Sequence, residues 1–219
     1  MDQFLTDADV RVLGALIEKQ TTTPDNYPLS LNALVLACNQ SSNRHPVVSF
    51  NEETVLAAIV HLRRASLVRG IQRIDSRVTK YEHTAADTLD LSEQEIAVLC
   101  VLMLRGPNTV GELRTRTERL AKFESLGDVE TALTALIERE NEPLVVRLPR
   151  KAGQKEVRYG HLLSGEVAVD SSEVLPTTTT VTAAPTADRV AVLEQTVAEL
   201  RTEVGEIRQQ LVEFRKQFE

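Results

Sequence analysis

The feature that most constrains this chain is an internal repeat. Residues 5–16 (LTDADVRVLGAL) and 91–102 (LSEQEIAVLCVL) align at an offset of 86 positions. In both segments a capping residue, Thr6 or the adjacent Asp7 and then Ser92, precedes acidic residues and an apolar face with helical spacing. Such caps and acidic first turns favour the beginning of a helix. The sequence therefore predicts two copies of one structural unit, each opening with a helix.

The repeat continues through the rest of each copy. Residues 55–62 and 129–136 predict another helix in each unit. Two short β-prone segments follow in each copy, at 67–72 and 78–83 and again at 144–149 and 157–161. The second of them ends in Tyr-x-His both times, at Tyr81/His83 and Tyr159/His161. Each copy therefore predicts a hairpin after its last helix.

A middle helix completes each unit. It is predicted at Ser30–Asn39 in the first copy and at about 110–120 in the second. Helix, helix, helix and hairpin is the order of a winged-helix domain. We predict a mainly α fold with small β hairpins (α+β), made of tandem winged-helix domains over residues 1–88 and 89–163.

The first copy is longer than the second. The offset falls from 86 at the first helix to 74 at the third, so the first copy holds about twelve extra residues. They fall within residues 12–46, where a polar stretch contains Pro24 and Pro28. This stretch is the most distinctive part of the first unit.

The C-terminal part has a different character. Residues 164–187 are rich in Thr, Ser, Ala and Pro, which predicts a flexible linker. Residues 188–219 carry apolar side chains at alternating spacings of three and four, from Val190 to Phe218. That heptad seam predicts a coiled-coil helix and a homodimer. Two alternatives stay open: a trimer, since Phe214 and Phe218 fit the seam less regularly, and an amphipathic helix that folds back on the chain's own domains.

The order of these features, with the segments LIEKQ, TTPD, YPLSLNAL and ACNQSSNR between residues 16 and 44, resembles the bacterial YceH family. The resemblance covers about residues 3–163 and leaves out the tail. It implies a tandem winged-helix fold in a cytoplasmic bacterial protein. It implies no activity, because that family is uncharacterised.

Composition excludes several classes of protein. Cys38 and Cys100 lie far apart in apolar helical runs, which indicates small buried side chains rather than a disulfide or metal site. No apolar run approaches the roughly 20 residues of a membrane span. The N-terminus lacks the pattern of a signal peptide. We therefore expect a cytoplasmic protein with no membrane contact.

The case for binding duplex DNA rests on charge. The net charge is −7, but residues 166–219 carry −5 of it, so the two repeats are nearly neutral. Basic side chains gather around both hairpins, where wings contact the phosphate backbone. The predicted nucleic-acid-binding residues are Arg63, Arg64, Arg69, Arg73, Arg77 and Lys80 in the first copy, and Arg147, Arg150, Lys151 and Lys155 in the second.

The third helices argue against sequence-specific reading of DNA. Their first turns hold Glu52 and Glu53, and Asp128 and Glu130, where a helix-turn-helix would approach the bases. Carboxylates there repel phosphate. The alternative function is a protein-interaction or scaffolding module built from the winged-helix pair and the coiled coil.

The polar segments 20–29 and 40–46 suggest a second surface. We expect them to pack together as a patch that binds a protein partner, with Tyr27, Asn43 and Arg44 as its residues and Arg44 as its anchor. Capping and turn formation are the alternative role for these side chains. The sequence contains none of the common catalytic motifs and no metal-ligand spacing, so we expect no enzyme activity, no metal and no cofactor.

Overall fold

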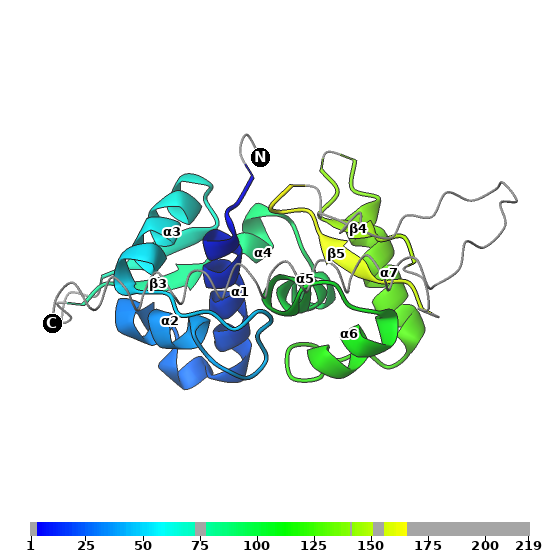
Figure 1. The fold of residues 1–219 in the computed structure, drawn as a ribbon, viewed down its shortest axis with the longest axis horizontal. Coiled ribbons are helices and arrows are strands. Elements are labelled where there is room, and N and C mark those ends of the chain that lie inside the picture. The colour runs from blue at the N-terminus through cyan, green and yellow to red at the C-terminus, as the bar shows by residue number, and fades with distance from the viewer. Residues whose placement is uncertain (1–3, 73–77, 141, 151–155, 166–219) are drawn as a thin grey trace, which may run out of the picture. The chain divides into compact units, whose positions relative to one another are not determined.

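The computed structural model describes residues 4–72, 78–140, 142–150 and 156–165 (Figure 1). The described part is mainly helical, with two small antiparallel sheets. The predicted α+β composition is therefore confirmed. The predicted coiled coil at 188–219, and all of the linker except residues 164 and 165, lie outside the described residues. None of the described helices is long and apolar enough to cross a membrane.

The first repeat contains three helices and a three-stranded sheet. The helices are α1 (Asp7–Thr22), α2 (Leu31–Cys38) and α3 (Glu52–Arg64), with a short 3-10 turn, η1 (Pro24–Asn26), after α1. The strands are β1 (Leu29–Ser30), β2 (Val68–Ile71) and β3 (Lys80–His83). Their order in the sheet is β1-β3-β2, with Val68 opposite His83. A short helix, α4 (Ala85–Thr88), leads to the second repeat.

The second repeat has the same order of elements. Its helices are α5 (Glu93–Arg105), α6 (Val110–Thr117) and α7 (Leu126–Ile137), followed by β4 (Val145–Arg147) and β5 (Tyr159–His161). Val145 lies opposite His161, which matches the pairing of Val68 with His83. A single bridge between Asn108 and Tyr159 takes the place of β1. The predicted positions of the helices and hairpins are confirmed in both copies.

Local capping explains where the helices begin. The side chains of Thr6 and Ser92 accept hydrogen bonds from the backbone N–H groups of Asp9 and Glu95. In turn, the carboxylates of Asp9 and Glu95 accept from the backbone N–H groups of Thr6 and Ser92. These reciprocal capping boxes satisfy donors that a helix end otherwise leaves open. Because each box depends on residues three positions apart, the sequence alone was enough to place both helices.

The extra residues of the first repeat are spread over three places. Helix α1 is three residues longer than α5. The connection before α2 is four residues longer than the one before α6, and the connection after α2 is five residues longer than the one after α6. The middle helices α2 and α6 have the same length. The extra length is therefore in the connections and at the end of α1.

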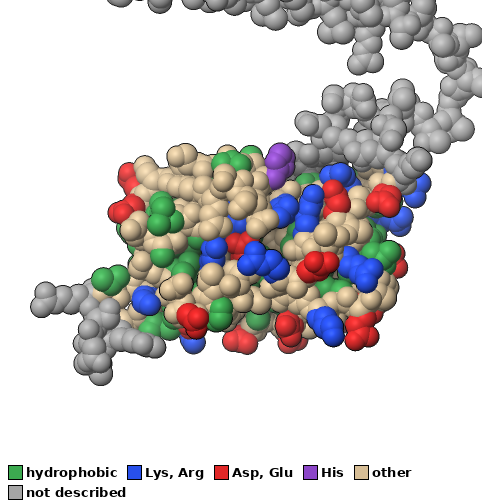
Figure 2. All heavy atoms as spheres, turned by 90° about the horizontal axis from the view of Figure 1, so that it is seen from below, with side chains coloured by type: hydrophobic (Ala, Val, Ile, Leu, Met, Phe, Trp, Pro, Cys, Tyr) green, Lys and Arg blue, Asp and Glu red, His purple; other side chains and the backbone are tan. Residues whose placement is uncertain are grey.

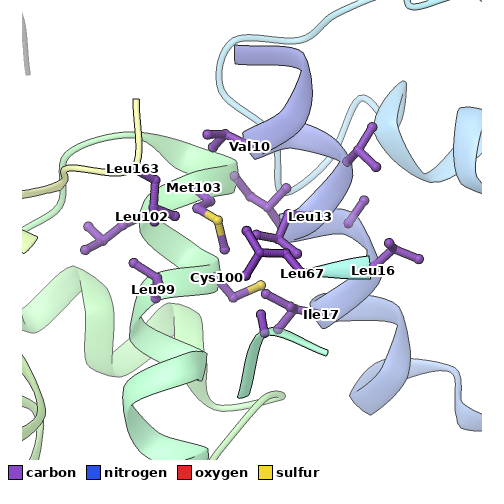
Figure 3. Close-up of a cluster of buried hydrophobic side chains, with 14 of the residues drawn as sticks. Val10, Leu13, Leu16, Ile17, Leu67, Leu99, Cys100, Leu102, Met103 and Leu163 are labelled. Carbon is purple, nitrogen blue, oxygen red and sulfur yellow. The ribbon is translucent and has the colours of Figure 1, made fainter. Parts of the chain in front are cut away.

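The two repeats share one hydrophobic core. Helices α1 and α5 pack against each other, and every residue from Asp9 to Glu18 and from Ala97 to Leu104 is buried. Figure 3 shows Leu13 and Ile17 of α1 beside Cys100 of α5. A helix that is buried on all sides must have neighbours on all sides. Each first helix is thus covered by its own repeat and by the other repeat.

The contact between α1 and α5 joins equivalent positions. Gly14 and Cys100 are separated by the repeat offset of 86, and the Cys100 thiol donates to the Gly14 carbonyl over 3.4 Å. Both cysteines are buried and free, as predicted. Residues that meet their own counterparts are typical of two-fold packing. The repeats therefore pack as a pair through one shared surface.

A side chain larger than hydrogen at Gly14 should loosen this packing. A Cβ atom there would lie 2.9 Å from Leu104 Cδ2 and 3.3 Å from the Met103 Cβ atom. We expect Gly14→Val to lower the free energy of unfolding by about 1–3 kcal/mol, because overpacking forces neighbours out of place. Urea denaturation measures the change. Gly111→Ala is the matched control, since no atom would meet its Cβ and the change should be neutral or stabilising by up to about 1 kcal/mol.

Candidate interaction surface

Helix α3 has a buried face and an outward face of unusual composition. Its buried residues, spaced as one helical stripe, are Val55, Ala58, Ile59 and Leu62. Outward, Leu56 and Val60 are each 43% exposed and stand one turn apart. Glu52 and Glu53 are exposed at the N-terminal end of the helix. The outward face of α3 therefore presents apolar side chains, with carboxylates at its beginning.

The outward face of α7 also lacks positive charge. The helix contains no Lys or Arg between Leu126 and Ile137. Leu126 is 47% exposed and Glu130 is exposed. Asp128 caps the helix by accepting from the backbone of Glu124 and Ser125, and the Ser125 hydrogen bonds hold the pKa of its carboxyl below the usual value. This carboxyl is therefore ionised at neutral pH, so the N-terminus of α7 is negative.

The basic residues predicted in the first wing are only partly described. Arg63 and Arg64 end α3 and are exposed. Arg69 and Lys80 are exposed on the two strands of the hairpin, and Arg69 forms an ion pair with Glu82. Arg73 and Arg77 lie outside the described residues. The structure thus places four predicted cations on the outside of the first repeat, one of them already paired.

The hairpin of the second repeat shows a similar pattern. Arg147 and Arg150 are exposed, while Lys151 and Lys155 lie outside the described residues. Arg158 donates to the Pro107 carbonyl over 3.1 Å and lies 3.8 Å from the Glu112 carboxylate. Nucleic-acid binding by either wing remains a prediction.

The expected role of Arg44 must be corrected. Its guanidinium is fully buried and meets the Glu18 carboxylate through two contacts, of 2.6 and 3.0 Å. It also donates to the carbonyl of Ala37 over 3.0 Å and to that of Asn43 over 3.0 Å. An arginine held in this way has no free face for a partner. Arg44 instead ties the connection after α2 to α1.

Tyr27 and Asn43 lie in different surroundings. The Tyr27 hydroxyl accepts from the backbone N–H of His83 over 2.8 Å, and burial is the main reason that its pKa is raised. Asn43 is exposed, has a φ of 58° and accepts from Arg105 of the second repeat. Tyr27 thus joins the sheet, whereas Asn43 joins the other repeat. Apart from the bond from Arg44 to the Asn43 carbonyl, the hydrogen bonds of these residues run to different neighbours, and partner binding by Tyr27 and Asn43 stays a prediction.

Two histidines, the buried His83 and the half-buried His161, occupy equivalent positions at the ends of β3 and β5. His83 meets the side chain of Gln20 through Nε2, and the Nδ1 atoms of His83 and His161 have no hydrogen-bond partner among the described residues. Burial lowers the pKa of each imidazole to about 4. At neutral pH both rings are therefore uncharged parts of the interior. In the described part of the chain, no three His, Cys, Asp or Glu side chains group as metal ligands would.

Sequence reasoning missed the exposed apolar side chains. Leu56 and Val60 were read with their neighbours in residues 55–62 as one helix. The exposed fraction of Leu36 on α2, which packs against α3, is 64%, and that of Val47 in the following connection is 58%. A helical projection would have found Leu56 and Val60, because they fall opposite the stripe that begins at Val55.

Comparison with known proteins adds a family and relatives. A model of the family described as "Protein of unknown function, DUF480" matches residues 5–154. A UPF0502 protein of Opitutus terrae is 54% identical over 172 residues, which are 78% of this chain and 75% of the relative. A UPF0502 protein of Vibrio atlanticus is 49% identical over 175 residues, which are 78% of this chain and 80% of the relative. A UPF0502 protein of Photobacterium profundum is 44% identical over 200 residues, which are 89% of this chain and 90% of the relative.

Proposed function

The chain belongs to the DUF480 family of bacterial proteins of unknown function, and we propose that its repeats are winged-helix domains that bind other proteins without catalysis. The observation that carries this proposal is the outward face of α3, where Leu56 and Val60 are exposed between acidic and basic ends. Exposed apolar side chains with a polar rim are typical of protein interaction sites, whereas readout of base edges relies mainly on side chains that form hydrogen bonds.

The order of the elements supports the winged-helix assignment. In each repeat the third helix is followed directly by an antiparallel hairpin. In the first repeat the short strand β1, between α1 and α2, pairs with β3, which is the central strand of the sheet. A helix-turn-helix backed by such a sheet leaves the outward face of its third helix free for recognition.

The charges on the third helices favour a protein over DNA. A third helix enters the major groove with its N-terminal residues nearest the bases. On α3 those residues are Glu52 and Glu53, and on α7 they include Asp128. Each carboxylate would meet a polyanion whose affinity depends on neutralising phosphates. The helix faces are therefore poorly suited to the groove.

The chemistry of the partner follows from the same face. Leu56 and Val60 would receive an apolar segment of the partner. Basic side chains of that segment would lie near Glu52 and Glu53, and acidic ones near Arg63 and Arg64. Pairing of two chains through residues 188–219 is part of the proposal, since two linked copies bind a repeated partner with greater avidity.

Introducing carboxylates into the exposed apolar face of α3 tests the proposal. We expect the double variant Leu56→Asp/Val60→Asp to lose its captured partner in quantitative affinity capture from a cell extract, because two buried carboxylates would oppose the apolar contact. The free energy of unfolding should change by no more than about 0.5 kcal/mol, since both sites are exposed. Mass spectrometry of the captured proteins gives the readout.

A wing variant provides the matched control. Arg69→Ala/Lys80→Ala removes two exposed charges from the hairpin and leaves α3 untouched. It should retain the partner. Loss of the partner in the wing variant, with retention in Leu56→Asp/Val60→Asp, would reject α3 as the binding surface.

Binding of duplex DNA is the second candidate function. The observation in its favour is that Arg63, Arg64, Arg69 and Lys80 are all exposed in the first repeat. Phosphate contacts from a wing would give weak, sequence-independent affinity. In this reading the hairpins, and not the third helices, touch the nucleic acid.

A further inference from the structure

A pocket lies at the seam between the two repeats. The end of α1 and the connection after α2 form one wall through Glu18, Thr22 and Asn43, and α5 and α6 form the other. Its volume is 410 Å³, within the range of about 300–1,000 Å³ that small-molecule sites occupy. Such sites occur preferentially where two domains meet. The position and size of the pocket therefore suit a small ligand.

The pocket is rich in guanidinium groups. Arg105, Arg116 and Arg119 all line it. Figure 2, which looks at the molecule from below, shows Lys and Arg side chains around a recessed acidic patch near the middle of that face. Burial, and next the charge of Arg116, lower the pKa of Arg105. Several like charges in a half-enclosed space repel one another unless an anion joins them.

The carboxylates of the pocket compensate these cations only in part, since the charge of Glu18 raises the pKa of Arg105 against the larger lowering by burial and Arg116. Glu18 is already held by the two contacts from Arg44. Arg116 lies 3.3 Å from Glu112. Among the described residues, neither Arg105 nor Arg119 is within ion-pair distance of a carboxylate, and the described hydrogen bond of Arg105 goes to the neutral amide of Asn43. Glu118 is the remaining carboxylate of the lining.

The rest of the lining is apolar or neutral. Cys100, Val101 and Leu104 of α5 are buried, and Leu120 lies beside them in the lining. The pKa of the Cys100 thiol is raised, mainly by burial, so it is protonated and behaves as a small apolar group. The hydroxyl of Thr22 can donate or accept a hydrogen bond. One side of the pocket thus suits a charged group and the other a short hydrocarbon chain.

We propose that the pocket between the repeats binds a small organic anion, with its phosphate or carboxylate on Arg105 and Arg119 and its apolar part against Val101, Leu104 and Leu120. Guanidinium groups bind such oxyanions through charge-assisted hydrogen bonds. Because the walls belong to both repeats, the ligand holds the connection after α2 to α6. This inference does not depend on which macromolecule α3 binds.

Titration of the full chain with three probes tests the site. The probes are butyl phosphate, inorganic phosphate and butyltrimethylammonium, followed through the backbone amide signals of Asn43, Thr115 and Arg119 by NMR. Butyl phosphate should give saturable shifts, because it satisfies both sides of the pocket. Inorganic phosphate should bind more weakly, and the cation should have no effect. Sodium chloride at matched ionic strength gives the baseline.

Two variants link the signal to the guanidinium groups. Arg119→Gln and Arg105→Gln should each weaken butyl phosphate by about tenfold or more, as expected for loss of a charge-assisted contact. Arg114→Gln, on α6 but outside the lining, should bind as the wild type does. Shifts that match those from sodium chloride would overturn the proposal. Binding of butyl phosphate by Arg119→Gln with the affinity of the wild type would also overturn it. Arg119 is exposed, so this substitution leaves the fold intact.

Discussion

Replacing Arg44 with alanine is expected to lower the free energy of unfolding by about 3–5 kcal/mol, because it leaves a buried charge without its partner. The Arg44 side chain is fully buried and makes contacts of 2.6 and 3.0 Å with Glu18. Its removal also leaves the Ala37 carbonyl without a donor that lies 3.0 Å away. Urea denaturation followed by circular dichroism measures the loss as a lower midpoint.

Two further variants give this prediction its controls. Arg69→Ala breaks an exposed ion pair with Glu82 and should cost less than about 1 kcal/mol. Glu18→Leu/Arg44→Leu removes both buried charges and should recover much of the loss from Arg44→Ala. If Arg44→Ala lowers the free energy of unfolding no more than Arg69→Ala does, the Arg44 guanidinium is not buried in solution. It would then be available as an exposed anchor for a partner.

Acid should lower the free energy of unfolding by protonating His83 and His161. The pKa of His83 and of His161 is about 4 in the folded chain, mainly because burial disfavours the charged ring, against an ordinary value of 6.5. Between these values the unfolded state binds more protons than the folded state. The contribution of the uncharged rings to the free energy of unfolding is therefore fully present above pH 6.5 and is lost as the pH drops toward 4. The full loss is roughly 3 kcal/mol for each histidine.

Denaturant titrations at a series of pH values between 7 and 4 test this expectation. The wild type should lose stability steeply across this window. His83→Leu/His161→Leu should be less stable at pH 7, because the contact with Gln20 is lost, but its stability should depend much less on pH. His45→Gln, at an exposed site, should keep the wild-type slope. Equal slopes in the wild type and the double leucine variant would show that the rings are accessible to protons in the folded state.

Features that depend on nearby residues could be predicted from the sequence. The caps at Thr6 and Ser92 each require a partner three positions away, and both are present. The hairpins follow from short β-prone segments, and the register that places Val68 opposite His83 recurs in the second copy. The comparisons confirm a family of uncharacterised bacterial proteins, while its identity with the YceH proteins stays a prediction.

Features that depend on distant residues were harder to predict. Arg44 looked like a surface anchor because its immediate neighbours are polar, but Glu18, 26 positions earlier, holds it inside. The shared core of the repeats, by contrast, is indicated by a pattern in the sequence. Gly14 and Cys100 are equivalent small residues, and the helices around them are apolar on more than one side. That pattern indicates a helix with neighbours on both sides.

A salt-dependent DNA titration most directly tests the proposal that the third helices bind protein and not DNA. Fluorescence anisotropy of a labelled, mixed-sequence duplex would be recorded with the full chain at about 50 mM and about 200 mM salt. We predict no saturable binding at the lower salt concentration, and the same result for Arg63→Ala/Arg64→Ala. Tight binding that falls steeply with salt and disappears in Arg63→Ala/Arg64→Ala would contradict the claim and establish the basic end of α3 as a nucleic-acid contact.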